Sequence, residues 1–224
     1  MEATGSYWAI LFYILLEAGI DVLLIDGRQT RQVPGRKTDV KDCQWIQQLH
    51  SCGLFNQCHV VEGRVKELRI YQRLREDNIE CASMHVLHMQ KAFLNMNIRL
   101  KEVISQLHGK SGMRIVEAIL DGERDKEKLL GICDSRIKKN KSEEVLKSLE
   151  GYYREEHLFA LRQAYDSYQY YQNKIGECDN RIEAVLKKMN SKKEPVKELA
   201  SRKPIRHNKP AIANLGQHMV QAYP

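Results

Sequence analysis

Two long stretches of the sequence repeat apolar side chains at alternating spacings of three and four residues, which limits the possible folds more than any other feature. The first stretch contains Ile79, Ala82, Val86, Met89, Phe93, Met96, Leu100, Val103 and Leu107. The second contains Ala164, Tyr168, Tyr171, Ile175, Cys178, Ile182, Val185 and Met189. This spacing places one apolar stripe along a helix that packs against another helix. We therefore predict two long helices that pair antiparallel as a helical hairpin or coiled coil.

The first part of the chain has a different pattern, which predicts alternating helices and strands. Residues 6–18 have helical periodicity, and Gly19 is suited to end that helix. Residues 20–26 are a short, branched apolar run, typical of a strand buried on both faces of a mostly parallel sheet. A second helix should begin with Thr38 as its N-cap and end near Gly53. Its inner stripe would contain Val40, Cys43, Ile46 and Leu49.

These patterns divide the chain into three regions. Residues 1–60 should form an α/β domain, and residues 61–190 should form the helical hairpin with a small helical cap at its far end. Residues 191–224 gain prolines and basic side chains, which is typical of a basic linker. The fold class is therefore α/β followed by a long antiparallel helical hairpin, and mostly α overall.

The charge balance points to a polyanionic partner and away from a membrane. Lys and Arg number 36 against 29 Asp and Glu, which gives a net charge of +7. The apolar run at residues 8–16 is too short to span a bilayer. Six scattered cysteines without a dense framework are typical of a reduced, cytoplasmic chain.

Asp39 and Asp42 form the most specific candidate for a functional site in the sequence. Two carboxylates three residues apart on a helix lie on one face. Mg²⁺ prefers oxygen ligands, and a carboxylate cluster can hold such ions for attack on phosphodiesters. Acids in a first helical turn also stabilise the helix dipole, and on their own these two fit that simpler role better. Glu2 is equally unremarkable when taken alone.

Taken together, two segments resemble the DEDD-type transposases of bacterial insertion sequences, in the one-ten group. The segments are residues 1–8 (MEATGSYW) and residues 34–42 (PGRKTDVKD), followed by Trp45. The resemblance continues through residues 109–112, residues 118–123 and the second long helix. It implies a RuvC-like, RNase H-like nuclease domain with a long coiled-coil insertion.

The resemblance also implies roles for the three acids. Glu2 matches the second acid of the family's catalytic tetrad, and Asp39 and Asp42 match the third and fourth, so all three are the implied Mg²⁺ ligands. The family's first acid lies upstream of such a segment, and a C-terminal domain with a nucleophilic serine follows the basic linker. We therefore expect a fragment truncated at both ends, with weak or lost Mg²⁺ binding and no activity alone.

Basic residues surround these acids and are the candidate nucleic-acid contacts: Arg28, Arg31, Arg36, Lys37 and Lys41. Arginine and lysine there could hold phosphates while the metal site addresses the scissile bond. The family implies DNA and a structured guide RNA as partners, and a nucleoid-associated location in the bacterial cytoplasm. A solvated basic loop remains the alternative.

Two functional interpretations remain open. In the first, the chain is part of a DNA transposase or recombinase that contributes Mg²⁺-binding acids to strand cleavage and exchange. In the second, it is a nucleic-acid-binding module that forms homo-oligomers through its coiled coil without catalysis. The tyrosines near Tyr168 and Tyr171 could stack on bases, but both lie in the apolar repeat, which favours packing.

Overall fold

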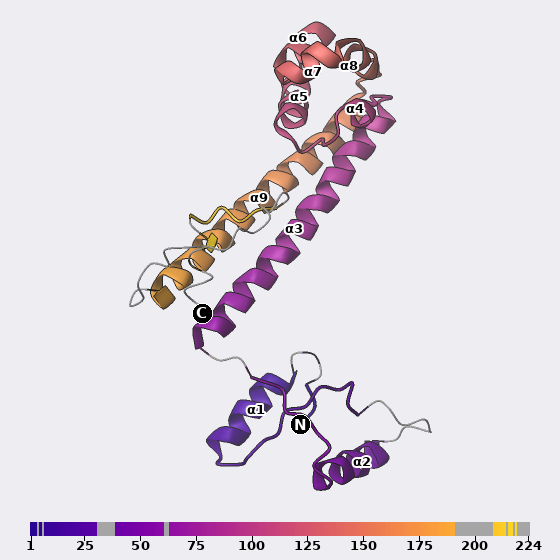
Figure 1. Cartoon of the computed structure of the whole chain (residues 1–224). Helices are drawn as coiled ribbons and strands as arrows, with labels where there is room; N and C mark the ends of the chain where they lie inside the picture. The colour runs from indigo at the N-terminus through magenta and orange to yellow at the C-terminus, as the bar shows by residue number, and fades with distance from the viewer. Residues whose placement is uncertain are drawn as a thin grey trace. The chain divides into compact units, whose positions relative to one another are not determined.

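The computed structural model describes residues 1–3, 5, 7–30, 39–60, 63–190, 208–213, 215–216 and 218. The chain divides into two compact units, Met1–Gly63 and Arg64–Pro224. The described residues are mostly helical (Figure 1). None of the helices in these ranges combines the length and apolar character that a membrane span requires.

The first unit contains two helices, α1 (Tyr7–Glu17) and α2 (Asp39–Ser51). Both are followed by a glycine in the left-handed region, Gly19 with φ +76° and Gly53 with φ +66°. In each case the amide after the glycine donates to a carbonyl five residues earlier, at 2.9 Å and 3.0 Å. These bonds close the helix ends as Schellman motifs. The predicted ends of both helices are therefore confirmed.

Val22, Leu24 and Ile25 are buried as predicted, but Ile20 is 50% exposed and the pairing of this run is short. Ile25 forms a parallel bridge with Glu2 and an antiparallel bridge with Gln57. The amide of Ala3 donates to the carbonyl of Ile25 at 2.8 Å, and the amide of Ile25 donates to the carbonyl of Met1 at 2.9 Å. Within the described residues these are isolated bridges and no strand is formed, so the expected α/β sheet is not confirmed.

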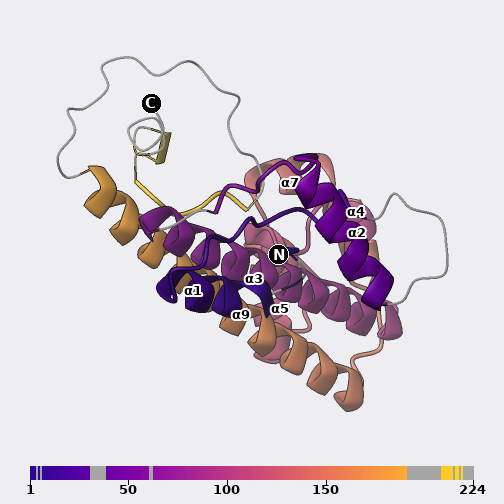
Figure 2. The same ribbon diagram turned by 90° about the horizontal axis from the view of Figure 1, so that it is seen from below.

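The second unit is built on two long antiparallel helices, α3 (Gly63–Asn95) and α9 (Glu155–Asn190) (Figures 1 and 2). Arg75 contacts Asp179, and His85 stacks on Tyr171, so residue numbers fall along α9 as they rise along α3. The predicted stripes face each other in the core. Their buried members in these helices are Ala82, Val86, Met89, Phe93, Ala164, Ile175, Cys178 and Val185.

The apolar repeat continues beyond the end of α3. Asn97 has φ +58°, and the amide of Ile98 donates to the carbonyl of Phe93 at 2.8 Å, which ends the helix. Met96, Leu100 and Leu107 are still buried, but in the core beneath the short helices between α3 and α9. These helices are α4 (Leu100–Val103), α5 (Lys110–Leu120), α6 (Lys126–Ile132), α7 (Ser135–Asn140) and α8 (Ser142–Ser148).

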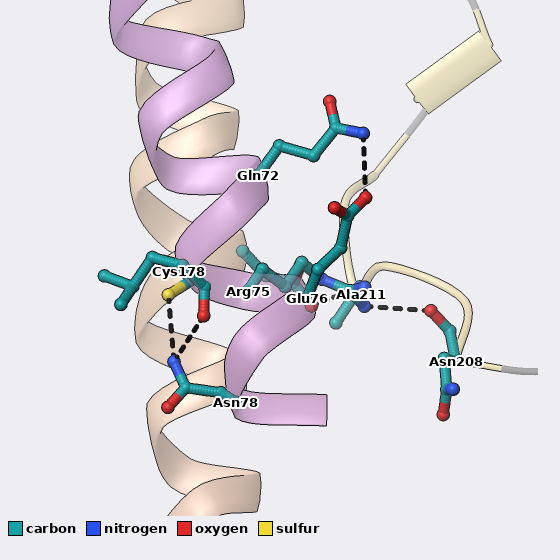
Figure 3. A network of polar contacts seen from close by, with 9 residues as sticks. Gln72, Arg75, Glu76, Asn78, Cys178, Asn208 and Ala211 are labelled. Atoms are coloured by element: carbon teal, nitrogen blue, oxygen red, sulfur yellow. Dashed lines mark hydrogen bonds and ion pairs between the residues drawn. The ribbon is translucent and has the colours of Figure 1, made fainter. Parts of the chain in front are cut away.

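A C-terminal segment, residues 208–213, is held against the two long helices by a buried ion pair (Figure 3). Arg75 donates from Nε to Oδ1 of Asp179 at 2.6 Å, and the two residues are 8% and 3% exposed. Arg75 also donates to the carbonyl of Asn208 at 2.9 Å, and the amide of Ala211 donates to Asp179 at 2.9 Å. The sequence predicts only a basic linker in this region, so this docking is a new finding.

Candidate metal and nucleic-acid site

Glu2 lies beside a glycine in the first unit, and the missing side chain there leaves room for its carboxylate. A Cβ added to Gly27 would come within 3.0 Å of Cδ of Glu2. The hydroxyl of Thr30 donates to the carbonyl of Gly27 at 2.9 Å and lies 3.4 Å from Oε2 of Glu2. Glu2 is half-buried. The sequence search predicted Glu2 but missed Gly27 and Thr30, which shape its surroundings.

Asp42 lies on the inner face of α2, one turn from its start. The half-buried positions of this helix are Asp42, Trp45, Ile46 and Leu49. The predicted stripe was therefore wrong at Val40, which is 68% exposed, and at Cys43, which is exposed. The sequence pattern counted only apolar residues, whereas the buried face includes a carboxylate and an indole. The indole Nε1 of Trp45 is buried and finds no hydrogen-bond partner among the described residues.

The elements that carry Glu2 and Asp42 face one pocket of about 420 Å³ in the first unit. Met1 and Ile25 line it from the paired segments, and Cys43 and Ile46 line it from α2. Asp39 is the first residue of α2, and its side chain lies outside the described part of the structure.

Asp26 is an acid that the sequence analysis missed, and Arg28 neutralises it. Arg28 donates to Oδ2 of Asp26 from Nε at 2.9 Å and from a terminal nitrogen at 2.7 Å. Hydrogen bonding to Asp26 and its charge raise the pKa of the Arg28 guanidinium above its ordinary value. The signal available in the sequence was an aspartate directly after the apolar run, with an arginine two residues later.

The predicted basic contacts are described only in part. The Arg28 side chain is 86% exposed despite its ion pair, and Lys41 is exposed on α2. Arg31, Arg36 and Lys37 lie outside the described residues, as does the predicted N-cap Thr38. Arg28 and Lys41 therefore present positive charge to solvent on the unit that carries the candidate acids.

A complete metal-ligand set is not assembled among the described side chains. No group of three histidines, cysteines, aspartates or glutamates lies close enough within them to hold an ion. The side chain of Asp39 lies outside the described part of the structure. The Glu2, Asp39 and Asp42 set therefore stays a prediction.

Comparison with protein families finds a similarity across the region that carries the candidate acids. Residues 1–97 match the family model for DEDD-type transposases of the IS110 group, described as "Transposase". The match includes the first unit and all of α3, so the chain is similar to that transposase family over less than half of its 224 residues. Comparisons with curated proteins and with solved structures find no match.

Proposed function

We propose that the chain is part of an insertion-sequence DNA transposase, and that Glu2, Asp39 and Asp42 hold Mg²⁺ in an RNase H-like, RuvC-like first unit. The observation that carries this proposal is the family match across the segments that contain all three acids. A pocket of the first unit supports it, because Met1 and Cys43, the sequence neighbours of Glu2 and Asp42, both line it, although neither acid does. The short parallel pairing of Glu2 with Ile25 is compatible with one edge of such a sheet.

The described surroundings fit a hard cation. Glu2 and Asp42 offer carboxylate oxygens, the donors that Mg²⁺ prefers, and the carboxylate of Glu2 occupies the space that a side chain at position 27 would fill. When bound, the ion would neutralise phosphate charge and activate the attacking oxygen. Arg28 and Lys41 would hold flanking phosphates. The buried Nε1 of Trp45 can donate to an oxygen that enters the site.

Replacing Asp42 by asparagine is expected to weaken Mg²⁺ binding by roughly tenfold or more, because a charged oxygen ligand becomes neutral. Isothermal titration of the purified chain with Mg²⁺ measures this change. Glu17→Gln is the matched control, since Glu17 is an exposed acid at the end of α1 in the same unit. Equal Mg²⁺ affinity of the wild type and the Asp42 variant would contradict the metal assignment.

Binding to duplex DNA or structured RNA should weaken steeply as salt rises, because each neutralised phosphate releases counterions. Lys41→Gln should reduce the slope of log K against log salt by about one. Arg28→Gln should reduce it less, since Asp26 already engages that guanidinium. Anisotropy titrations from about 50 to 200 mM salt provide the slopes. A flat salt dependence would argue against nucleic-acid binding altogether.

Catalysis by this chain alone is not expected. The family's catalytic site uses four acids, and no group of three potential metal ligands is assembled among the described side chains. We expect no Mg²⁺-dependent strand cleavage by the purified protein on duplex DNA. Robust cleavage that disappears in the Asp42→Asn variant would overturn this expectation and show a complete site.

Self-association through the long helices is the second proposed function, and the surface of α3 favours it. Several apolar side chains of α3 are about half or more exposed and lie outside the predicted α3 stripe. They are Ile70, Leu74, Met84, Leu87 and Leu94. Such exposed apolar surface favours a partner helix. Sedimentation equilibrium should show dimers, and Leu74→Gln should weaken them at least tenfold; a monomer at every concentration would reject this function.

A further inference from the structure

A pocket of about 450 Å³ opens in the second unit, where α3 and α9 meet the residues before α5 and the C-terminal segment. Its apolar wall is formed by Ile79, Val86 and Ile175. Ile175 is 9% exposed and Val86 is 8% exposed, so this wall is continuous with the interface of the two long helices. The pocket therefore combines an apolar wall with polar side chains.

Three side-chain amides surround the opening, from three separate parts of the chain. Gln106 precedes α5, Gln172 lies on α9, and Asn208 belongs to the C-terminal segment. The amides of Gln106 and Gln172 make no hydrogen bond to any described residue. Each amide offers both a donor and an acceptor, which is the combination that pairs with the edge of a nucleobase.

The remaining polar groups favour an aromatic, uncharged ligand. Tyr168 lines the pocket from α9 and is half-buried, and burial raises the pKa of its hydroxyl, which stays protonated. His108 adds a second ring at the opening. None of the described residues that line the pocket is a lysine, arginine, aspartate or glutamate. A free phosphate or a metal ion would therefore find no counter-charge here.

The buried ion pair completes the pocket. Arg75 donates to the backbone carbonyl of Asn208 at 2.9 Å, and Asp179 accepts the amide of Ala211, so the C-terminal segment is fixed at two points (Figure 3). Asn208 itself has φ +48°. The backbone of Asn208 is thus held by Arg75, a residue that does not line the pocket.

We propose that this pocket receives one unpaired nucleobase of a bound single-stranded nucleic acid. The base would stack between the ring of Tyr168 and the apolar wall, and its edge would pair with the amides of Gln106 and Gln172. The proposal rests on the nucleic-acid binding proposed above and adds a base-dependent contact to it. It assigns to the second unit a binding role that the acids of the first unit do not supply.

The test compares the binding of two RNA probes that have the same length and the same number of phosphates but differ in whether they carry bases. One is a single-stranded oligouridylate of about twelve nucleotides, and the other is its fully abasic counterpart. The full chain should bind the first about tenfold more tightly, which is the loss expected for one stacked base. Gln172→Leu should bring the two affinities close to equality.

Gln163→Leu is the matched control on the same helix. Gln163 is exposed and lies nine residues before Gln172, which is two and a half helical turns and therefore the opposite face. This variant should keep the wild-type preference. Equal wild-type affinity for the two probes, or an unchanged preference in Gln172→Leu, overturns the pocket assignment while leaving phosphate binding intact. Binding of neither probe overturns the pocket and the proposed nucleic-acid function together.

Discussion

Arg75→Met is expected to lower the free energy of unfolding by about 3–5 kcal/mol. The substitution leaves the carboxylate of Asp179 buried, at 3% exposure, without its cationic partner. It also removes the hydrogen bond that holds the carbonyl of Asn208. Urea unfolding of the full chain, followed by far-ultraviolet circular dichroism, measures the change.

An exposed ion pair on α9 provides the control. Lys187 lies 2.9 Å from Glu183 one turn earlier, with its side chain 63% exposed, so Lys187→Met should cost only about 0.3–0.5 kcal/mol. Adding Asp179→Leu to Arg75→Met should recover much of the loss, because no buried charge remains. A loss below about 1 kcal/mol for Arg75→Met would contradict the buried pair, since exposed pairs already reach that value.

Gly112→Ala and Gly176→Ala should change stability in opposite directions, although both glycines lie inside helices. A Cβ at Gly112 in α5 would collide with the carbonyl oxygen of Leu107 and lie 2.7 Å from its carbonyl carbon. Because backbone must move to relieve this contact, we expect a loss of about 1–3 kcal/mol. A Cβ at Gly176 in α9 would meet nothing within 4 Å, so alanine should stabilise the protein by about 0.5–1 kcal/mol.

Thermal unfolding of the two variants beside the wild type measures this difference. Gly131→Ala in α6 is a second control, because that position is also open and should respond as Gly176 does. A stabilising Gly112→Ala would show that α5 does not approach Leu107 as closely as the structure has it. A destabilising Gly176→Ala would contradict the open position of Gly176 on α9 and leave the packing of α5 untouched.

The pair of long helices could be predicted because its signal is repeated. Each apolar stripe contains eight or nine positions, so one residue that departs from the spacing does not obscure the helical pattern. The end of α3 could not be placed in this way, because the apolar repeat runs on through Leu107. A single residue, Asn97, ends the helix through its positive φ, and asparagine gives only a weak signal for that conformation.

The buried ion pair and the docked C-terminal segment were beyond sequence reasoning for a different reason. Arg75 meets Asp179 across 104 positions and Asn208 across 133 positions of the chain. An arginine in a helix is ordinarily read as solvent-exposed, and nothing local identifies its partners. Pairings of such long range follow from the fold and not from the neighbouring residues.

At the candidate site, too, sequence motifs predicted which residues matter, whereas the arrangement of the side chains could not be predicted. Glu2, Asp39 and Asp42 were predicted from two motifs that matched a family, and the family match over residues 1–97 is confirmed. The face of α2 was predicted from apolar spacing alone; it was right at Ile46 and Leu49 and wrong at Val40 and Cys43. Asp42 and Trp45 share the half-buried side of this helix. The Asp26–Arg28 pair was missed because Asp26 was assigned to the predicted strand and Arg28 to the basic residues that follow it.

Paramagnetic line broadening by Mn²⁺, which takes the same oxygen ligands as Mg²⁺, tests the proposed metal site most directly. Substoichiometric Mn²⁺ added to the isotopically labelled chain should first broaden the amide signals of Glu2, Gly27 and Asp42, and Asp42→Asn should abolish that pattern. Broadening confined to residues 64–190, or an equal response of the Asp42 variant, would contradict a shared cation site and remove the basis for a metal-dependent role.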